Sequence, residues 1–227
     1  MRDIKVKICG LKNENDVKLC MCLGVDILGF VTEYPLPVPW NLSRDETSLL
    51  LKLIPPSYKT SIITGGSPYK VIKIARELRP SYIQLHYKET LEDTIIICDA
   101  LKKLDIGVIK TIPPIREDLL DQFGTTNIET IVKELCKTNI FALLADSRVP
   151  ANSSEKGSEL NLEFCSKIIK LSTKPVIIAG GITADNVRNI VFKTNAKYID
   201  IMTGVEITPE KKDPQLLSRL LSNVHSL

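Results

Sequence analysis

The sequence has few of the features that mark membrane, secreted or nucleic-acid-binding proteins. None of its apolar runs reaches the ~18 residues that a membrane span needs, and no apolar signal region follows Arg2. Its 30 Lys and Arg residues are scattered and nearly balanced by 27 Asp and Glu, so the net charge is only +3. A charge this small does not indicate a nucleic-acid partner. We therefore expect a cytoplasmic protein with neither a membrane nor a nucleic acid as partner.

Residues suited to zinc binding are also scarce. The chain has only two histidines and six cysteines, and the one close cysteine pair, Cys20 and Cys22, has no second cluster to complete a site. Structural zinc sites usually combine two C-x-x-C or Cys/His pairs. The sequence therefore predicts no metal site, and scattered cysteines in apolar segments are typical of reduced, buried thiols.

The composition that remains is that of an ordinary globular protein, with 44% hydrophobic and 25% charged residues. A length of 227 residues fits one large domain, which we expect to span 1–227. Short apolar segments recur along it and predict strands at 5–9, 25–31, 60–64, 82–87, 107–112, 140–146, 175–181 and 198–204. Helical segments separate them, whereas three prolines in 34–43 exclude regular structure there, and 113–127 is also expected to be irregular.

Eight apolar strands that alternate with helices indicate a parallel sheet buried on both faces. Eight such units in this length favour a closed (β/α)8 TIM barrel. An open doubly wound sheet is the alternative, but no G-x-G-x-x-G motif follows the first strand, which disfavours its dinucleotide-binding form. We expect the α/β barrel.

In such a barrel the chemistry is carried at the carboxyl ends of the strands. Cys9 follows the first predicted strand, His86 the fourth and Asp146 the sixth. Each residue taken alone also has a purely structural interpretation: a buried thiol, a polar rim residue and a loop cap. A catalytic interpretation makes Asp146 a general acid, His86 a substrate-binding or acid–base group and Cys9 a base.

Glycines follow the last two predicted strands, in AGGITADN and in MTGVE. Gly180, Gly181, Thr203 and Gly204 would let backbone N–H groups approach an anion close to a helix N-terminus. Tight strand–helix turns are the alternative explanation. Because the loops after strands seven and eight are the usual phosphate site of this barrel, we expect them to bind phosphate.

Together these segments resemble the phosphoribosylanthranilate isomerase family of tryptophan biosynthesis. The resemblance rests on KVKICGLKNENDV, GVDILGFV, YIQLHY, LLADS, VIIAGGITADNVRNIV and YIDIMTGVEITPEKKDPQLLSRLL, which occur in the family's order. It implies a cofactor-free and metal-free Amadori rearrangement of a phosphorylated sugar substrate. It also implies Cys9 as the general base and Asp146 as the general acid, with phosphate bound by the two glycine loops.

The sequence departs from the family pattern where the aromatic end of the substrate would bind. An arginine is usual in the loop after the second strand, but here the loop reads YPLPVPWNLS. We expect Trp40 to stack on the aromatic ring, Arg44 or Arg148 to meet its carboxylate, and His86 to bind substrate. This departure leaves open an isomerase of another phosphorylated aminoaldose, or a silent sugar-phosphate-binding barrel. The expected assembly is a monomer or a homodimer.

Overall fold

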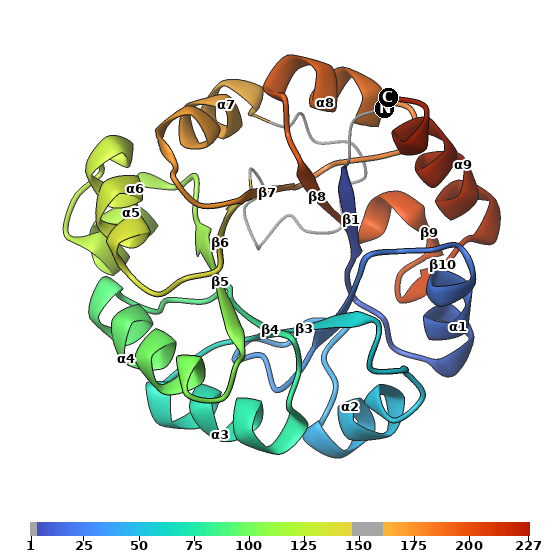
Figure 1. Ribbon diagram of the computed structural model, residues 1–227, viewed down its shortest axis with the longest axis horizontal. Coiled ribbons are helices and arrows are strands. Elements are labelled where there is room, and N and C mark those ends of the chain that lie inside the picture. The colour runs from blue at the N-terminus through green and yellow to red at the C-terminus, as the bar shows by residue number, and fades with distance from the viewer. Residues whose placement is uncertain (1–3, 147–160) are drawn as a thin grey trace.

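Eight parallel strands close into a barrel in which each strand pairs with its sequence neighbours and β8 returns to β1. The computed structural model describes residues 4–146 and 161–227. Figure 1 looks down the barrel and shows the helices as an outer ring. The predicted TIM barrel is confirmed. The barrel strands are β1 (Lys5–Ile8), β2 (Ile27–Val31), β3 (Lys59–Thr64), β4 (Tyr82–Leu85), β5 (Gly107–Ile112), β6 (Ala142–Asp146), β7 (Val176–Ala179) and β8 (Tyr198–Ile201).

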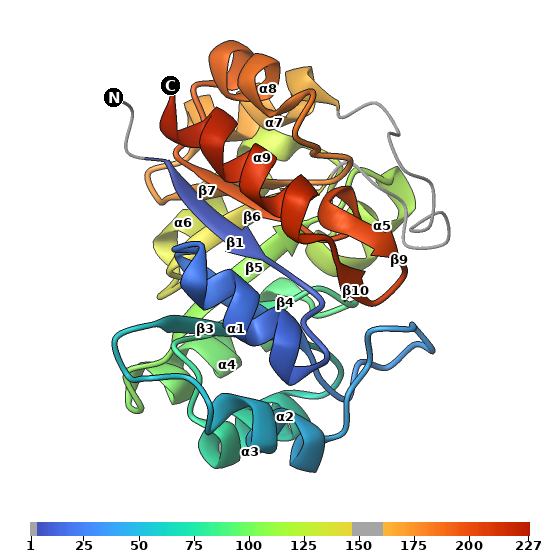
Figure 2. The same cartoon turned by 90° about the vertical axis from the view of Figure 1, so that its right-hand side faces the viewer.

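The helices follow the strands in sequence and cover the outside of the barrel, as the side view in Figure 2 also shows. Their starts carry ordinary sequence signals: Ser43 and Glu46 form a reciprocal capping box, and Pro68 occupies the first turn of its helix. The helices are α1 (Glu14–Cys22), α2 (Arg44–Leu51), α3 (Pro68–Leu78), α4 (Leu91–Lys102), α5 (Arg116–Phe123), α6 (Ile128–Lys137), α7 (Leu162–Leu171), α8 (Val187–Thr194) and α9 (Pro214–His225).

One helix and one pair of short strands were not expected from the sequence. The segment 113–127 contains α5, so its expected irregularity was wrong, and residues 206–212 form a small antiparallel pair, β9 (Glu206–Thr208) and β10 (Lys211–Lys212). Helix α5 has no side-chain cap at its start, and Gln122 near its end accepts a hydrogen bond from the buried Lys110 of β5 at 2.9 Å. Tertiary contacts of this kind specify a helix whose own sequence signals are weak.

The interior of the barrel divides into an apolar and a polar part. Ile109, Leu144 and Ile177 belong to an apolar cluster contributed by β5, β6 and β7. Across the barrel, the buried Lys7 of β1 bonds to Asp200 of β8 at 2.8 Å. Because a buried charge is costly unless it is paired, Lys7 and Asp200 each depend on the other for burial in the barrel. The polar part therefore lies directly below the catalytic residue predicted at the end of β1.

Candidate active site

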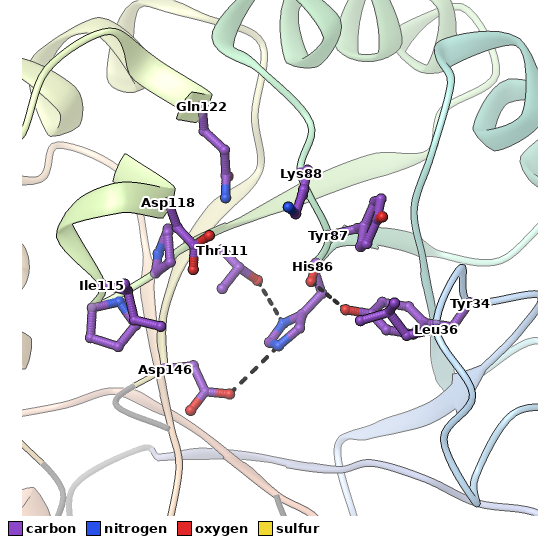
Figure 3. A pocket seen from close by; sticks show the side chains of 12 residues that line it. Tyr34, Leu36, His86, Tyr87, Lys88, Thr111, Ile115, Asp118, Gln122 and Asp146 are labelled. Carbon is purple, nitrogen blue, oxygen red and sulfur yellow. Dashed lines mark hydrogen bonds and ion pairs between the residues drawn. The ribbon is translucent and has the colours of Figure 1, made fainter. Parts of the chain in front are cut away.

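The structure brings His86 and Asp146 together at the mouth of the barrel. His86 Nε2 lies 3.7 Å from Asp146 Oδ2, and the two side chains are 23% and 14% exposed. The other ring nitrogen, Nδ1, lies 2.9 Å from the Thr111 hydroxyl, and the Tyr34 hydroxyl donates to the His86 carbonyl at 2.7 Å. Figure 3 shows these groups around one opening, with His86 between Thr111 and Asp146. Asp146 is thus presented to a ligand entering the mouth.

The electrostatic setting keeps His86 neutral. Burial lowers the pKa of the imidazole, and this effect outweighs the nearby Asp146 and Asp200 carboxylates, which act in the opposite direction. Its ordinary pKa is already below neutrality. A neutral imidazole can hydrogen-bond to Asp146 without placing a positive charge beside it.

Cys9 lies at the end of β1, in a small apolar cluster with Val31, Ile63 and Trp40. Its side chain is only 6% exposed. Burial raises the pKa of the thiol, and Asp200 adds to the increase, while the ammonium groups of Lys7 and Lys212 act against it. A thiol in this setting stays protonated near neutral pH and, once ionised, is a strong base.

Lys7 is the cation nearest to Cys9 on the barrel interior. Burial lowers its pKa, but the Asp200 carboxylate and the Cys9 sulfur more than offset this, so the pKa of Lys7 is raised. Gly29 on β2 leaves the room that Lys7 needs, because a Cβ there would come within 3.1 Å of Lys7 Nζ and of Cys9 Cα. The Lys7 ammonium group therefore has room beside Cys9 and carries the positive charge that would stabilise a Cys9 thiolate.

The two glycine loops after β7 and β8 lie in contact. Gly180 and Gly181 have φ angles of 95° and 63°, in the left-handed region that favours glycine. Asn186 fixes their loop by donating to the Gly181 carbonyl and by accepting from the Thr183 amide, both at 2.8 Å. Helix α8 begins at Val187, after a turn that follows these glycines. The loop after β7 thus has a backbone conformation that favours glycine, and a turn separates it from the helix N-terminus.

Replacing Gly204 by alanine is expected to separate these loops. An added Cβ would lie 1.9 Å from the Ile182 carbonyl oxygen, a clash with backbone that side-chain rotation cannot relieve. We expect a loss of about 1–3 kcal/mol in urea unfolding and weaker binding of inorganic phosphate. Gly24→Ala is the comparison for backbone strain without a clash, because Gly24 has a positive φ of 75°, unlike Gly204, and a Cβ there would meet nothing within 4 Å. A Gly204→Ala protein as stable as wild type would contradict the predicted clash.

Two of the residues expected at the aromatic end of the substrate, Arg44 and Trp40, have other partners in the structure. Arg44 is held by two carboxylates, with Glu33 at 2.8 Å and with Glu77. Trp40 is 4% exposed, and its indole donates to Glu206 at 2.9 Å. Arg148 lies outside the described residues. Trp40 thus packs beside Cys9 instead of offering a free face to a ligand ring.

Sequence reasoning missed the ionic groups behind Cys9. Lys7 and Asp200 interrupt apolar strands, in KVKIC and YIDIM, and such interruptions are the one signal that could have found them. Lys212 Nζ donates to Glu206 Oε1 at 2.6 Å, the same oxygen that accepts the Trp40 indole. These contacts anchor the loop after β2 to the segment after β8. They give Glu206 and Lys212, in the segment GVEITPEKKD, a structural role.

An open cleft with a cavity volume of about 90 Å³ adjoins His86 and Asp146. The loops after β2, β4 and β5 supply most of its wall, which Figure 3 shows from close by. Aromatic and apolar groups dominate this wall, a composition typical of small-molecule sites. The lining residues are Tyr34, Leu36, His86, Tyr87, Lys88, Thr111, Pro113, Pro114, Ile115, Asp118, Gln122 and Asp146.

Residues 4–146 and 161–227 contain no group of three or more His, Cys, Asp or Glu side chains placed to hold a metal ion. Over the same residues, no helix has the length and apolar character that crossing a bilayer requires.

The chain is similar to known proteins over almost its whole length. The family model described as N-(5'phosphoribosyl)anthranilate (PRA) isomerase matches residues 6–223. A relative of that name from Methanocaldococcus jannaschii is 30% identical, over 96% of this chain and 95% of its own length. Another, from Halorubrum lacusprofundi, is 26% identical over 96% and 95%. The phosphoribosyl anthranilate isomerase structure from Thermotoga maritima superposes with a TM-score of 0.80 at 23% identity, covering 99% of this chain and 100% of the other.

Proposed function

Because the chain belongs to the N-(5'-phosphoribosyl)anthranilate isomerase family of tryptophan biosynthesis, we propose that it performs the family's Amadori rearrangement with Cys9 as base and Asp146 as acid. The substrate would be N-(5'-phosphoribosyl)anthranilate and the product 1-(2-carboxyphenylamino)-1-deoxyribulose 5-phosphate. The observation that carries the assignment of roles is that Cys9 and Asp146 end β1 and β6, on opposite sides of one barrel mouth.

The first step opens the sugar ring. Asp146 in its protonated form donates its proton to the furanose ring oxygen, and the bond from that oxygen to C1 breaks. The electron pair of the anthranilate nitrogen forms a C1–N double bond, which gives an iminium ion. Asp146 is suited to this role because it lies at the mouth, is only slightly exposed and faces the neutral His86.

The second step moves the proton from C2. The Cys9 thiolate removes that proton, the C–H electron pair forms a C1–C2 double bond, and the iminium electrons return to nitrogen. The enolamine then loses its C2 hydroxyl proton and gains a proton at C1, which leaves the ketone. Lys7 assists because its ammonium group lowers the pKa of Cys9 and would stabilise the thiolate before the transfer.

The phosphate would bind at the two glycine loops. Gly180 and Gly181 have no Cβ atoms to keep a phosphate from their backbone N–H groups, and Gly204 packs against the same loop, next to Thr203 in the chain. No metal or other cofactor enters the proposed reaction, which is balanced by the two side chains alone. We further propose that the protein acts in the cytoplasm as a monomer or a homodimer, with this phosphorylated sugar as its small-molecule partner.

The proposal is tested by supplying freshly prepared phosphoribosylanthranilate to the purified protein and following the loss of its fluorescence. We expect turnover without added metal and in the presence of a chelator. Turnover of a different phosphorylated aminoaldose, with none of the anthranilate compound, would assign the alternative isomerase. Binding of a sugar phosphate without turnover of either compound would assign the silent barrel.

A further inference from the structure

The cleft beside Asp146 has aromatic and apolar side chains in its wall, of the kind that pack against an aromatic ring. Tyr34 is fixed in place by its hydrogen bond to the His86 carbonyl, and it meets Tyr87 edge to face, with ring centroids 6.0 Å apart. Pro114 and Ile115 line the same cleft. A planar ring attached to the reacting carbon can therefore lie against this wall while C1 stays near Asp146.

The cleft also lies on the correct side of the mouth. Its walls come from the loops after β2, β4 and β5, whereas the glycine loops proposed for phosphate follow β7 and β8. Asp146, at the end of β6, stands between the two. A substrate held by its phosphate at one side would thus extend past the acid and place its other end in this cleft.

That other end carries an ionised carboxylate, which is costly to place in an apolar cleft without a cation. Lys88 is the one Lys or Arg side chain among the described residues that line the cleft. It is exposed, and within residues 4–146 and 161–227 no hydrogen bond or ion pair engages its ammonium group. Figure 3 shows it in the wall beside Tyr87.

Three other cations of the described residues near the mouth are already engaged. Lys70 donates to the Glu33 and Gly65 carbonyls, and Lys110 is fully buried on the Glu89 carbonyl and Gln122. Arg44, as described above, holds two carboxylates. Among the described residues, Lys88 therefore has the free charge and the position that a ring carboxylate requires.

We propose that Lys88 binds the ring carboxylate of the substrate and so determines specificity for an anthranilate end; this rests on the proposed function. Asp118 lines the same cleft and opposes the attraction between Lys88 and the substrate carboxylate. Its carboxylate would repel the substrate's, so Asp118→Asn is expected to tighten binding while Lys88→Gln weakens it.

The test uses two non-reacting probes: the reduced product analogue, which carries the ring carboxylate, and the same compound without that carboxyl group. Wild type is expected to prefer the first. Lys88→Gln should weaken its binding about tenfold and leave the second unchanged, while Lys88→Arg should retain the preference. Lys73→Gln, an exposed position on α3, is the control and should bind both probes as wild type does.

The outcomes separate this inference from the proposed function. If Lys88→Gln weakens both probes equally, or neither, the assignment of Lys88 is wrong even though the protein is an isomerase. A wild type that binds neither probe overturns the proposed function itself. In turnover, Lys88→Gln should raise KM about tenfold with kcat within about threefold of wild type, and a fall in kcat alone would contradict a binding role.

Discussion

Changing Cys9 to serine is expected to lower kcat about a thousandfold without unfolding the protein. A serine hydroxyl is nearly isosteric with the thiol but ionises far less readily, so the C2 proton would lose its acceptor. The thiol is buried among Val31, Ile63 and Trp40, and a hydroxyl of similar size would leave no large cavity there. Single-turnover kinetics with fresh substrate would measure the effect.

Cys22→Ser is the matched control, because Cys22 is an exposed free cysteine on α1. Its kcat should equal that of wild type. Asp146→Asn should lower kcat by a similar factor, since an amide cannot donate a proton to the ring oxygen and recover it. A Cys9→Ser enzyme with more than about a tenth of wild-type activity would rule out the thiol as the base.

The pH dependence of kcat/KM gives an independent test of Cys9 as the base. The base must be ionised, and burial raises the pKa of Cys9, so kcat/KM should increase as pH rises from neutral toward that pKa. The residual activity of Cys9→Ser should lack this increase. An activity that declines from pH 7 upward while the protein stays folded would contradict the assignment.

Removing the cation beside Cys9 is the second large effect that we expect. In Lys7→Met the thiolate loses its nearest positive charge, so the pKa of Cys9 should rise further and the alkaline increase in kcat/KM should move to higher pH. At pH 7 less of the thiol would be ionised, and kcat/KM should fall about a hundredfold. A fall in activity with an unmoved pH profile would indicate a purely structural role for Lys7.

Stability must be separated from catalysis in this experiment. Lys7→Met leaves Asp200 buried without its partner, which is expected to cost about 3–5 kcal/mol in unfolding free energy. The double variant Lys7→Met/Asp200→Asn removes both charges and should recover much of that stability, while its activity at pH 7 stays low. Urea unfolding of both proteins, followed by kinetics below the unfolding transition, distinguishes the two effects.

The barrel could be predicted because its signal is local and repeated. Each apolar strand and each helix is visible in the sequence, and closure follows from their number. Helix α5 was missed because Pro113, Pro114 and Gly124 suggest a loop, whereas the helix depends on contacts such as the bond from Lys110 to Gln122. Those contacts join separate elements and leave no mark in the local pattern.

The site residues also divide into those with a local sequence signal and those that depend on contacts between distant elements. Cys9, Asp146 and the glycine loops could be placed because each ends a recognisable strand. The fate of Arg44 could not be foreseen, because its carboxylate partner Glu77 lies 33 residues further along the chain. The Lys7–Asp200 pair spans 193 positions and exists only once the barrel has closed. Lys88 gave no signal beyond being one of many exposed lysines.

The seam between β1 and β8 has a consequence for how the protein is made. Cys9 belongs to the first strand, but its amide donates to the Ile201 carbonyl of the last strand at 2.8 Å, and Lys7 is held by Asp200. During synthesis Cys9 leaves the ribosome early, and β8 is not available to pair with β1 until almost the entire chain has been made. Until β8 docks, that sulfur is an ordinary cysteine, open to alkylation and oxidation. Completion of the last strand both shields it from such damage and supplies its charged neighbours.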